Sequence, residues 1–336
     1  MLMRDSSTLA RFSATIFCAG CIISPAKAHS TDAPVLNQAI PLPRVHGGFN
    51  HMSVDDQHHR LFAPAPADGM LEVVDLTSGK LWRSLPAKRP TTALYAPDTR
   101  QLYLTSGRDL VIYDDTLRVI ASIDLHSRLD ELQYDASARE LIIGRMSPGE
   151  TGIAIVTVPA GKLAATVTLP SSPQGLAIEP GARRLFVNLP DDGAVVVIDL
   201  QKRKAVATWK LKGASDNFPI ALSEKDGRLF VATRTPAEML AIDARTGRTI
   251  ARVPCVDDAD DMWYDAARSR IYISGGGGFL SVIQQQGPDR YRSLDQVRTA
   301  PHASNSTFSS RTKSLYIGVP PGNNQVAEIA VYRIAP

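Results

Sequence analysis

The sequence predicts an all-β fold, a seven-bladed β-propeller, from three observations. One phrase, typified by Arg184-Leu185-Phe186-Val187, recurs seven times in the 336 residues. Its second residue falls at positions 61, 102, 141, 185, 229, 271 and 315, so successive copies lie 39 to 44 residues apart. Each copy is flanked by other short β-branched runs with turn residues between them. A period of ~40–45 residues is typical of propellers that have one four-stranded blade per repeat.

Before the repeats, residues 1–28 are predicted to be a secretory signal peptide. A basic start precedes an apolar run, 12–23, which is too short to cross a bilayer comfortably, and Ala26-Lys27-Ala28 fits a cleavage site. The mature chain would then begin at His29 and be periplasmic or secreted, with no membrane span. An uncleaved anchor is the alternative.

The next segment, 31–45, has strand character over Val35–Leu42 but no repeat of its own. The final repeat, from Pro301, is about one strand short. We therefore expect residues 35–42 to complete the last blade and close the ring, which removes free sheet edges. The predicted blades span residues 46–87, 88–127, 128–171, 172–213, 214–256, 257–300 and 301–336 plus 31–45.

Blade four illustrates the plan that the others follow. Its predicted strands, from the innermost outward, are 176–178, 184–188, 194–199 and 205–209, each bounded by Gly, Pro, Asp or Asn. An Asp ends the third apolar run in four blades. We interpret these residues as turn formers that accept backbone N–H bonds; they are Asp75, Asp114, Asp199 and Asp243.

Charge and composition exclude some classes of function. The chain has 37 Lys and Arg against 34 Asp and Glu, a net charge of +3, and without the leader the balance is 34 against 33, a net of +1. No basic tract with interleaved aromatics is present, so nucleic-acid binding is not expected. Lys202-Arg203-Lys204 fits a hairpin tip, and three scattered tryptophans argue against a quinone-cofactor dehydrogenase. We expect a monomer.

Cysteine usage is sparse. Cys18-Ala19-Gly20-Cys21 resembles a lipobox, so a lipid anchor at Cys21 is an alternative to simple cleavage. Only Cys255 lies outside the leader, so no internal disulfide is expected. No Cys-x-x-Cys-His motif for c-type haem occurs.

Several phrases resemble one known family. Leu185-Phe186-Val187-Asn188, Val196-Val197-Ile198-Asp199 and Asp260-Asp261-Met262-Trp263-Tyr264-Asp265 are similar to the YVTN-repeat, or YncE-like, exported bacterial propellers. The resemblance covers about residues 31–336 and implies the propeller fold. Such propellers include lactone-opening enzymes, lyases, quinoprotein-like subunits and binding proteins, so the resemblance does not fix a function.

In a propeller, the lead-ins to the innermost strands and the turns between second and third strands surround one mouth of the central channel. That face is the expected ligand site. The candidate residues on it are His46, His51, Arg89, Arg128, Asp130, Arg145, Gln174, Asn217, Arg234, Asp258, Asp260, Asp261, His302 and Asn305. The wider set of polar lead-in and turn residues also contains Asn50, Thr91, Arg108, Glu131, Asn188, Asp216 and Asp257.

The run Asp257–Asp261 places four carboxylates in five residues. Asp258 and Asp260 could hold a hard cation such as Ca²⁺, or one carboxylate could act as a general base whose pKa its neighbours raise. Alternatively, one caps a turn and the others face water. The spacing matches no known calcium loop.

Two further groups of side chains have alternative roles. His46, His51 and His302 belong to neighbouring blades of the closed ring, where they could bind a transition metal or exchange protons. Alternatively, each bonds backbone. The four candidate arginines could form an anion site, or could instead neutralise the acidic run of blade six.

The glycine run 275–278 fits a hairpin turn better than a phosphate loop, because neither Lys-Ser/Thr nor a helix follows it. Taken together, the sequence favours an exported binding or scaffold protein for a small molecule or a periplasmic protein. The alternative is a metal-assisted, lactonase-like hydrolase or lyase that uses the acidic loop 257–261.

Overall fold

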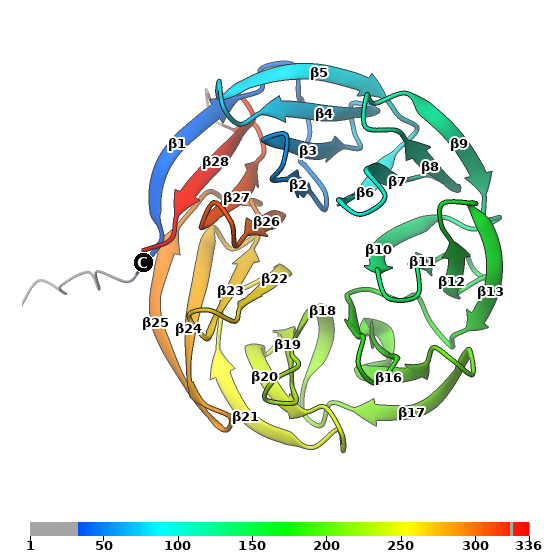
Figure 1. Ribbon diagram of the computed structural model, residues 1–336. Coiled ribbons are helices and arrows are strands. Elements are labelled where there is room, and N and C mark those ends of the chain that lie inside the picture. The colour runs from blue at the N-terminus through cyan, green and yellow to red at the C-terminus, as the bar shows by residue number, and fades with distance from the viewer. Residues whose placement is uncertain (1–32, 323–324, 336) are drawn as a thin grey trace, which may run out of the picture.

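The computed structural model describes residues 33–322 and 325–335, which form a closed ring of seven blades around a central channel (Figure 1). Each blade is one antiparallel sheet of four strands. The fold class predicted from the repeat is therefore confirmed. The proposed leader, 1–28, lies outside the described residues.

The strand bounds follow the repeat. Blade one contains β2 (Ser53–Asp55), β3 (Arg60–Ala65), β4 (Met70–Asp75) and β5 (Lys80–Pro86). Blade two contains β6 (Pro90–Ala96), β7 (Gln101–Ser106), β8 (Asp109–Tyr113) and β9 (Val119–Asp124). Blade three contains β10 (Leu129–Asp135), β11 (Glu140–Arg145), β12 (Gly152–Thr157) and β13 (Lys162–Thr168). Blade four contains β14 (Leu176–Glu179), β15 (Arg184–Leu189), β16 (Ala194–Asp199) and β17 (Lys204–Lys210), with a short 3₁₀ turn, η1 (Pro190–Asp192), between β15 and β16.

The remaining blades have the same order. Blade five contains β18 (Ser215–Ser223), β19 (Arg228–Thr235), β20 (Ala237–Asp243) and β21 (Thr249–Pro254). Blade six contains β22 (Ala259–Asp265), β23 (Arg270–Gly275), β24 (Phe279–Gly287) and β25 (Arg290–Arg298). Blade seven contains β26 (Ser306–Ser309), β27 (Ser314–Val319), β28 (Glu328–Arg333) and β1 (Val35–Pro41).

Strand β1 closes the ring as predicted. It pairs antiparallel with β28, so Ile40 lies opposite Ile329 at the outer edge of blade seven (Figure 1). Ile40 is buried in a cluster that also contains Leu61 and Val74 of blade one. The first described strand thus links the two ends of the chain through both hydrogen bonds and apolar packing.

The recurring phrase forms the second strand of every blade, and its apolar residues build the core. Seven apolar clusters each join two adjacent blades, so the core is a ring of interblade layers. Between blades one and two, the ring centroids of Phe62 and Tyr95 lie 6.1 Å apart. Burying each large apolar side chain is favourable by ~1.5–3 kcal/mol. Because both faces of a second strand are covered, the phrase reads as a continuous apolar run.

The turn predictions also hold. Asp75, Asp114, Asp199 and Asp243 each accept a backbone N–H from two or three residues further on, at 2.8–2.9 Å. The glycine run forms the turn between β23 and β24, where Gly278 has a φ of +83°. A Cβ at Gly276 would lie 2.1 Å from Oδ2 of Asp258, so a side chain there would require the carboxylate of Asp258 to move.

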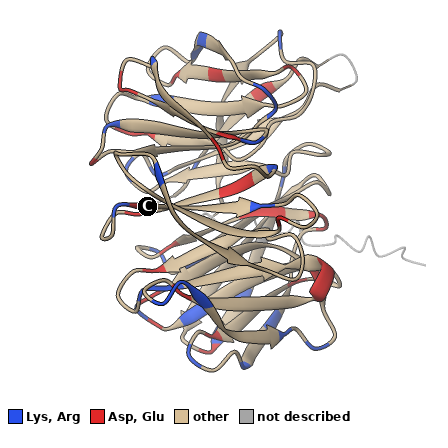
Figure 2. Ribbon diagram, turned by 90° about the vertical axis from the view of Figure 1, so that its right-hand side faces the viewer, with Lys and Arg blue, Asp and Glu red and all other residues tan. Residues whose placement is uncertain are grey.

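Acidic and basic residues are interspersed over the face seen in Figure 2, without a large area of one sign. Among the described residues, no helix is long and apolar enough to cross a membrane.

Candidate functional site

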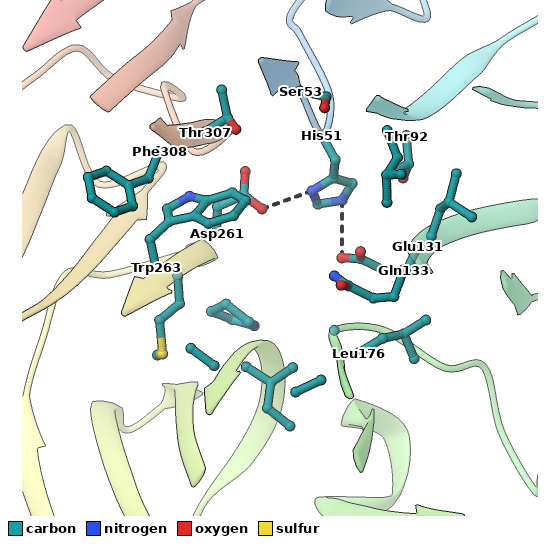
Figure 3. A pocket seen from close by; sticks show the side chains of 18 of the residues that line it. His51, Ser53, Thr92, Glu131, Gln133, Leu176, Asp261, Trp263, Thr307 and Phe308 are labelled. Carbon is teal, nitrogen blue, oxygen red and sulfur yellow. Dashed lines mark hydrogen bonds and ion pairs between the residues drawn. The ribbon is translucent and has the colours of Figure 1, made fainter. Parts of the chain in front are cut away.

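The central channel contains a cavity of about 480 Å³ lined by the innermost strands, or their lead-ins, of all seven blades. Figure 3 shows its polar end, where His51 lies between Asp261 of blade six and Glu131 of blade three. Residues far apart in the sequence therefore meet here because the ring brings their blades to one axis. We call this group, His51, Glu131, Asp260 and Asp261, the channel cluster.

His51 reaches the channel from the segment just before β2, and its backbone is anchored on both sides. Its N–H donates to Oδ1 of Asn50 at 3.0 Å, and its carbonyl accepts the N–H of Ala93 in the next blade at 3.0 Å. These bonds fix the direction of the side chain into the cavity.

Both ring nitrogens of His51 face a carboxylate. Nδ1 lies 2.9 Å from Oδ1 of Asp261, and Nε2 lies 3.5 Å from Oε1 of Glu131. The second oxygen of Asp261 accepts the backbone N–H of Ser306 at 2.7 Å, which ties the cluster to blade seven. The side chains of His51, Glu131 and Asp261 are only 11–14% exposed.

Irregular strand pairing places Glu131, Asp260 and Asp261 on the wall of the cavity. The register of β22 against β23 shifts between Ala259 and Asp261, and that of β10 against β11 shifts between Leu129 and Leu132. In a regular strand, successive side chains point to opposite faces. Here a bulge allows both Asp260 and Asp261 to line the cavity.

Asp260 is bonded from two neighbouring blades. Its Oδ2 accepts hydrogen bonds from Nδ2 of Asn305 at 3.0 Å and from Oγ of Ser304 at 3.2 Å. Its Oδ1 accepts a bond from Nη2 of Arg234 at 3.0 Å, and Nη1 of the same arginine lies 3.0 Å from Oδ1 of Asp258. Arg234 thus neutralises part of the acidic run, which is the second of the two roles expected for the arginines.

The protonation of the cluster follows from its burial and charge. Burial acts to lower the pKa of His51, but the charges of Glu131 and Asp261 outweigh it and raise that pKa well above its ordinary value. Burial raises the pKa of Glu131 to about 7, against the opposing charge of His51. Burial also raises the pKa values of Asp130 and Asp260. Glu131 and Asp260, which line the cavity, therefore take up protons more readily than exposed carboxylates, and Glu131 does so in the neutral range.

The other predicted residues have different environments. His46 is 82% exposed and bonds Asp68 of its own blade at 2.9 Å, and His302 is exposed. Asn217 is buried and donates from Nδ2 to the carbonyl of Ala194 at 2.9 Å. Gln174 is half-buried and donates its backbone N–H to the carbonyl of Asn188.

The predicted arginines do not line the cavity in the part of the chain that the structure describes. Arg89 and Arg128 are exposed, Arg145 pairs with Glu150, and Arg234 pairs with Asp258 and Asp260. Within residues 33–322 and 325–335, these four arginines therefore do not converge on an anion site at the channel.

The candidate set omits several residues that the structure places at the site. Glu131 belongs only to the wider lead-in set, whereas its neighbour Asp130 is among the candidates; the bulge in β10 brings Glu131 beside His51. Thr92, Trp263 and Phe308 also line the cavity. The only sequence signal for them is their position in or next to an innermost strand, which many residues share.

A separate group meets the distance requirement for three metal ligands. Asp55, His58 and Asp115 hold their ligand atoms within 4.8 Å of one another, and they form the one such group in residues 33–322 and 325–335. Arg60 already binds both carboxylates, at 2.6 and 3.1 Å, and Arg100 binds Asp115 at 2.6 Å. These fixed positive charges oppose a cation there.

The metal prediction for Asp258 and Asp260 stays a prediction. Their carboxylates do not belong to a compact ligand group among the described residues, and Arg234 lies between them. The residues present therefore fit an ion pair with arginine better than Ca²⁺, which takes about six to eight oxygen ligands.

Comparison with known proteins supports the fold and goes no further. No protein-family model matches the sequence, and no curated protein matches it. A solved structure described as Kuenenia stuttgartiensis hydrazine synthase is similar, with 15% identity and a TM-score of 0.75 over 93% of this chain and 99% of that one. A chain of a mitotic checkpoint complex is similar with 14% identity and a TM-score of 0.77, over 96% of this chain and 99% of that one. At such identities the likeness shows the fold alone.

Proposed function

We propose that this chain is an exported binding protein whose ligand site is the channel cavity at the channel cluster. The observation that carries the proposal is His51, held between Asp261 and Glu131 inside a cavity of about 480 Å³ to which all seven blades contribute. Cavities of ~300–1,000 Å³ with a few convergent polar groups are typical of small-molecule sites.

The geometry of His51 favours binding over general-base catalysis. A general base needs a neutral imidazole with a free nitrogen near the proton that it removes. Here both nitrogens face carboxylates. Burial acts to lower the pKa of His51, but the charges of these carboxylates outweigh it and raise that pKa, which disfavours the neutral imidazole. A lactonase-like mechanism built on the acidic loop would further require Asp258 and Asp260 to leave Arg234.

Export is proposed from the leader alone, and the resemblance to YVTN-repeat, YncE-like propellers is consistent with it. Mass spectrometry of protein from a periplasmic fraction tests this proposal. A mature chain that begins at His29 supports simple cleavage, while a lipid-modified Cys21 supports an anchored protein. A cytoplasmic chain with an intact leader would contradict export.

The ligand site is tested by thermal unfolding with a library of small cations, anions and neutral compounds. A compound at 100 times its Kd stabilises the folded state by ~2.7 kcal/mol. We expect at least one compound to raise the melting temperature of the wild type and of Glu224→Gln, an exposed carboxyl outside the channel cluster. The rise should be lost in His51→Gln and Glu131→Gln. Binding that survives both cluster variants would place the site elsewhere.

A further inference from the structure

The charges on the cavity wall restrict the class of ligand. Its lining contains the carboxyl groups of Asp56, Glu131, Asp260 and Asp261, and His51 is the one basic side chain on it among the described residues. His51 already faces two of these carboxylates, and Arg234, which does not line the cavity, pairs with Asp260, so the four carboxyl groups still outnumber the two basic side chains. An anionic ligand would therefore meet excess negative charge and find no free cation on this wall, whereas a cationic ligand would reduce the imbalance.

Aromatic residues stand beside the carboxylates. Trp263 and Phe308 line the cavity, and Trp263 is the nearer of the two to Asp261 (Figure 3). The indole N–H of Trp263 donates to Oγ of Ser306 at 3.1 Å, which fixes the ring. Aromatic faces attract organic cations as well as apolar groups. The same wall therefore suits both a positively charged end and a hydrocarbon body.

A buried hydroxyl group lacks a partner on the opposite wall. Thr92 is 4% exposed, lines the cavity near His51, and its Oγ1 makes no hydrogen bond in the described structure (Figure 3). A buried polar atom without a partner is costly, so such an atom commonly marks a place for a ligand group or a water molecule.

The shape of the site distinguishes an organic cation from a metal ion. The cavity of about 480 Å³ is many times larger than one ion, and among the described residues its carboxylates do not form a group with three ligand atoms within 4.8 Å. The wall also contains aliphatic residues, among them Leu132, Leu176 and Ile220. A point charge would be poorly coordinated here, but an elongated molecule would contact both kinds of surface.

We propose that the channel ligand is an elongated organic ammonium ion. Its charged end lies at Glu131, Asp260 and Asp261, and its apolar body contacts Trp263 and the aliphatic wall. This inference rests on the proposed function, because it names the ligand class of the same cavity.

The test compares probes of matched shape and different charge. Wild-type mature protein is titrated by calorimetry at pH ~7.5 with 2-phenylethylammonium, 2-phenylethanol and phenylacetate, and separately with CaCl₂. We expect the ammonium probe to bind at least tenfold more tightly than the alcohol, and the carboxylate probe not to bind. Glu131→Gln should lower the affinity for the ammonium probe at least fivefold, while Glu224→Gln should leave that affinity unchanged.

The outcomes separate the two proposals. If the alcohol or the carboxylate binds as tightly as the ammonium probe and its binding depends on Glu131, the ammonium inference is wrong and the channel site stands. If CaCl₂ binds in a Glu131-dependent manner and displaces the ammonium probe, the site is a metal site and the inference is again wrong. If neither these probes nor the wider library bind in a His51-dependent manner, both proposals fail.

Discussion

Replacing Glu131 by Gln tests the electrostatic description of the channel most directly. Burial raises the pKa of this carboxyl from 4.5 to about 7. The folded protein therefore keeps a proton that the unfolded chain releases between pH ~4.5 and ~7, so its stability falls as pH rises through this window. A tenfold difference in proton affinity between the folded and unfolded states is worth ~1.4 kcal/mol, so the difference between these two pKa values amounts to about 3 kcal/mol.

Glu131→Gln keeps the shape of the side chain and removes the titration. We expect the free energy of unfolding of the wild type to fall by about 3 kcal/mol relative to the variant between pH ~4.5 and pH ~8. The raised pKa of His51 in the folded state also makes stability fall as pH rises. The stabilisation from protonated His51 is complete below its unfolded pKa and is lost as pH rises through its folded pKa. Losing the charge of Glu131 lowers the pKa of His51, which flattens the curve of the variant further.

The assay is urea unfolding followed by tryptophan fluorescence at several pH values and constant ionic strength. Glu224→Gln, an exposed carboxyl, serves as the control and should follow the wild-type curve. Parallel curves for the wild type and Glu131→Gln would refute the reasoning, because they would show that Glu131 has the same pKa in both states.

Three further predictions concern the site and the closure of the ring. Asp261→Asn should lower the pKa of His51, measured by NMR titration of its ring protons, and destabilise the protein by ~1.5–3 kcal/mol, because a bond between charged groups is lost. Ile40→Ala should cost ~2–4 kcal/mol in urea unfolding, because Ile40 is 1% exposed in the layer that closes the ring. Gly175→Ala should destabilise by ~1–3 kcal/mol, since a Cβ there would lie 2.3 Å from the backbone oxygen of Phe218.

Matched controls accompany these variants. Val35→Ala changes a residue of the same strand as Ile40 that is 66% exposed, and its effect should stay within ~0.5 kcal/mol. Gly48→Ala adds a Cβ with no atom within 4 Å and should be similarly mild. Equal losses for Ile40→Ala and Val35→Ala would show that β1 does not close the ring by packing. An unchanged His51 pKa in Asp261→Asn would remove that carboxylate from the electrostatics of the site.

The sequence alone determined the blade architecture, because each blade carries its own signals. Apolar phrases such as Leu185-Phe186-Val187 define second strands, and aspartates such as Asp199 mark the turns, so local chemistry repeated seven times specifies one plan. The closing strand could also be predicted from the sequence, because the last repeat is about one strand short.

Only the tertiary structure decided which polar residues meet. His51, Glu131 and Asp261 come from three blades, and the distances between their side chains depend on the closed ring. These distances also depend on bulges in β10 and β22, which no local sequence pattern predicts. The same closure left His46 in solvent and directed Arg234 to the acidic run. Blade formation depends on short-range periodicity, but the site depends on long-range geometry, which a shift of one residue in strand register is enough to change.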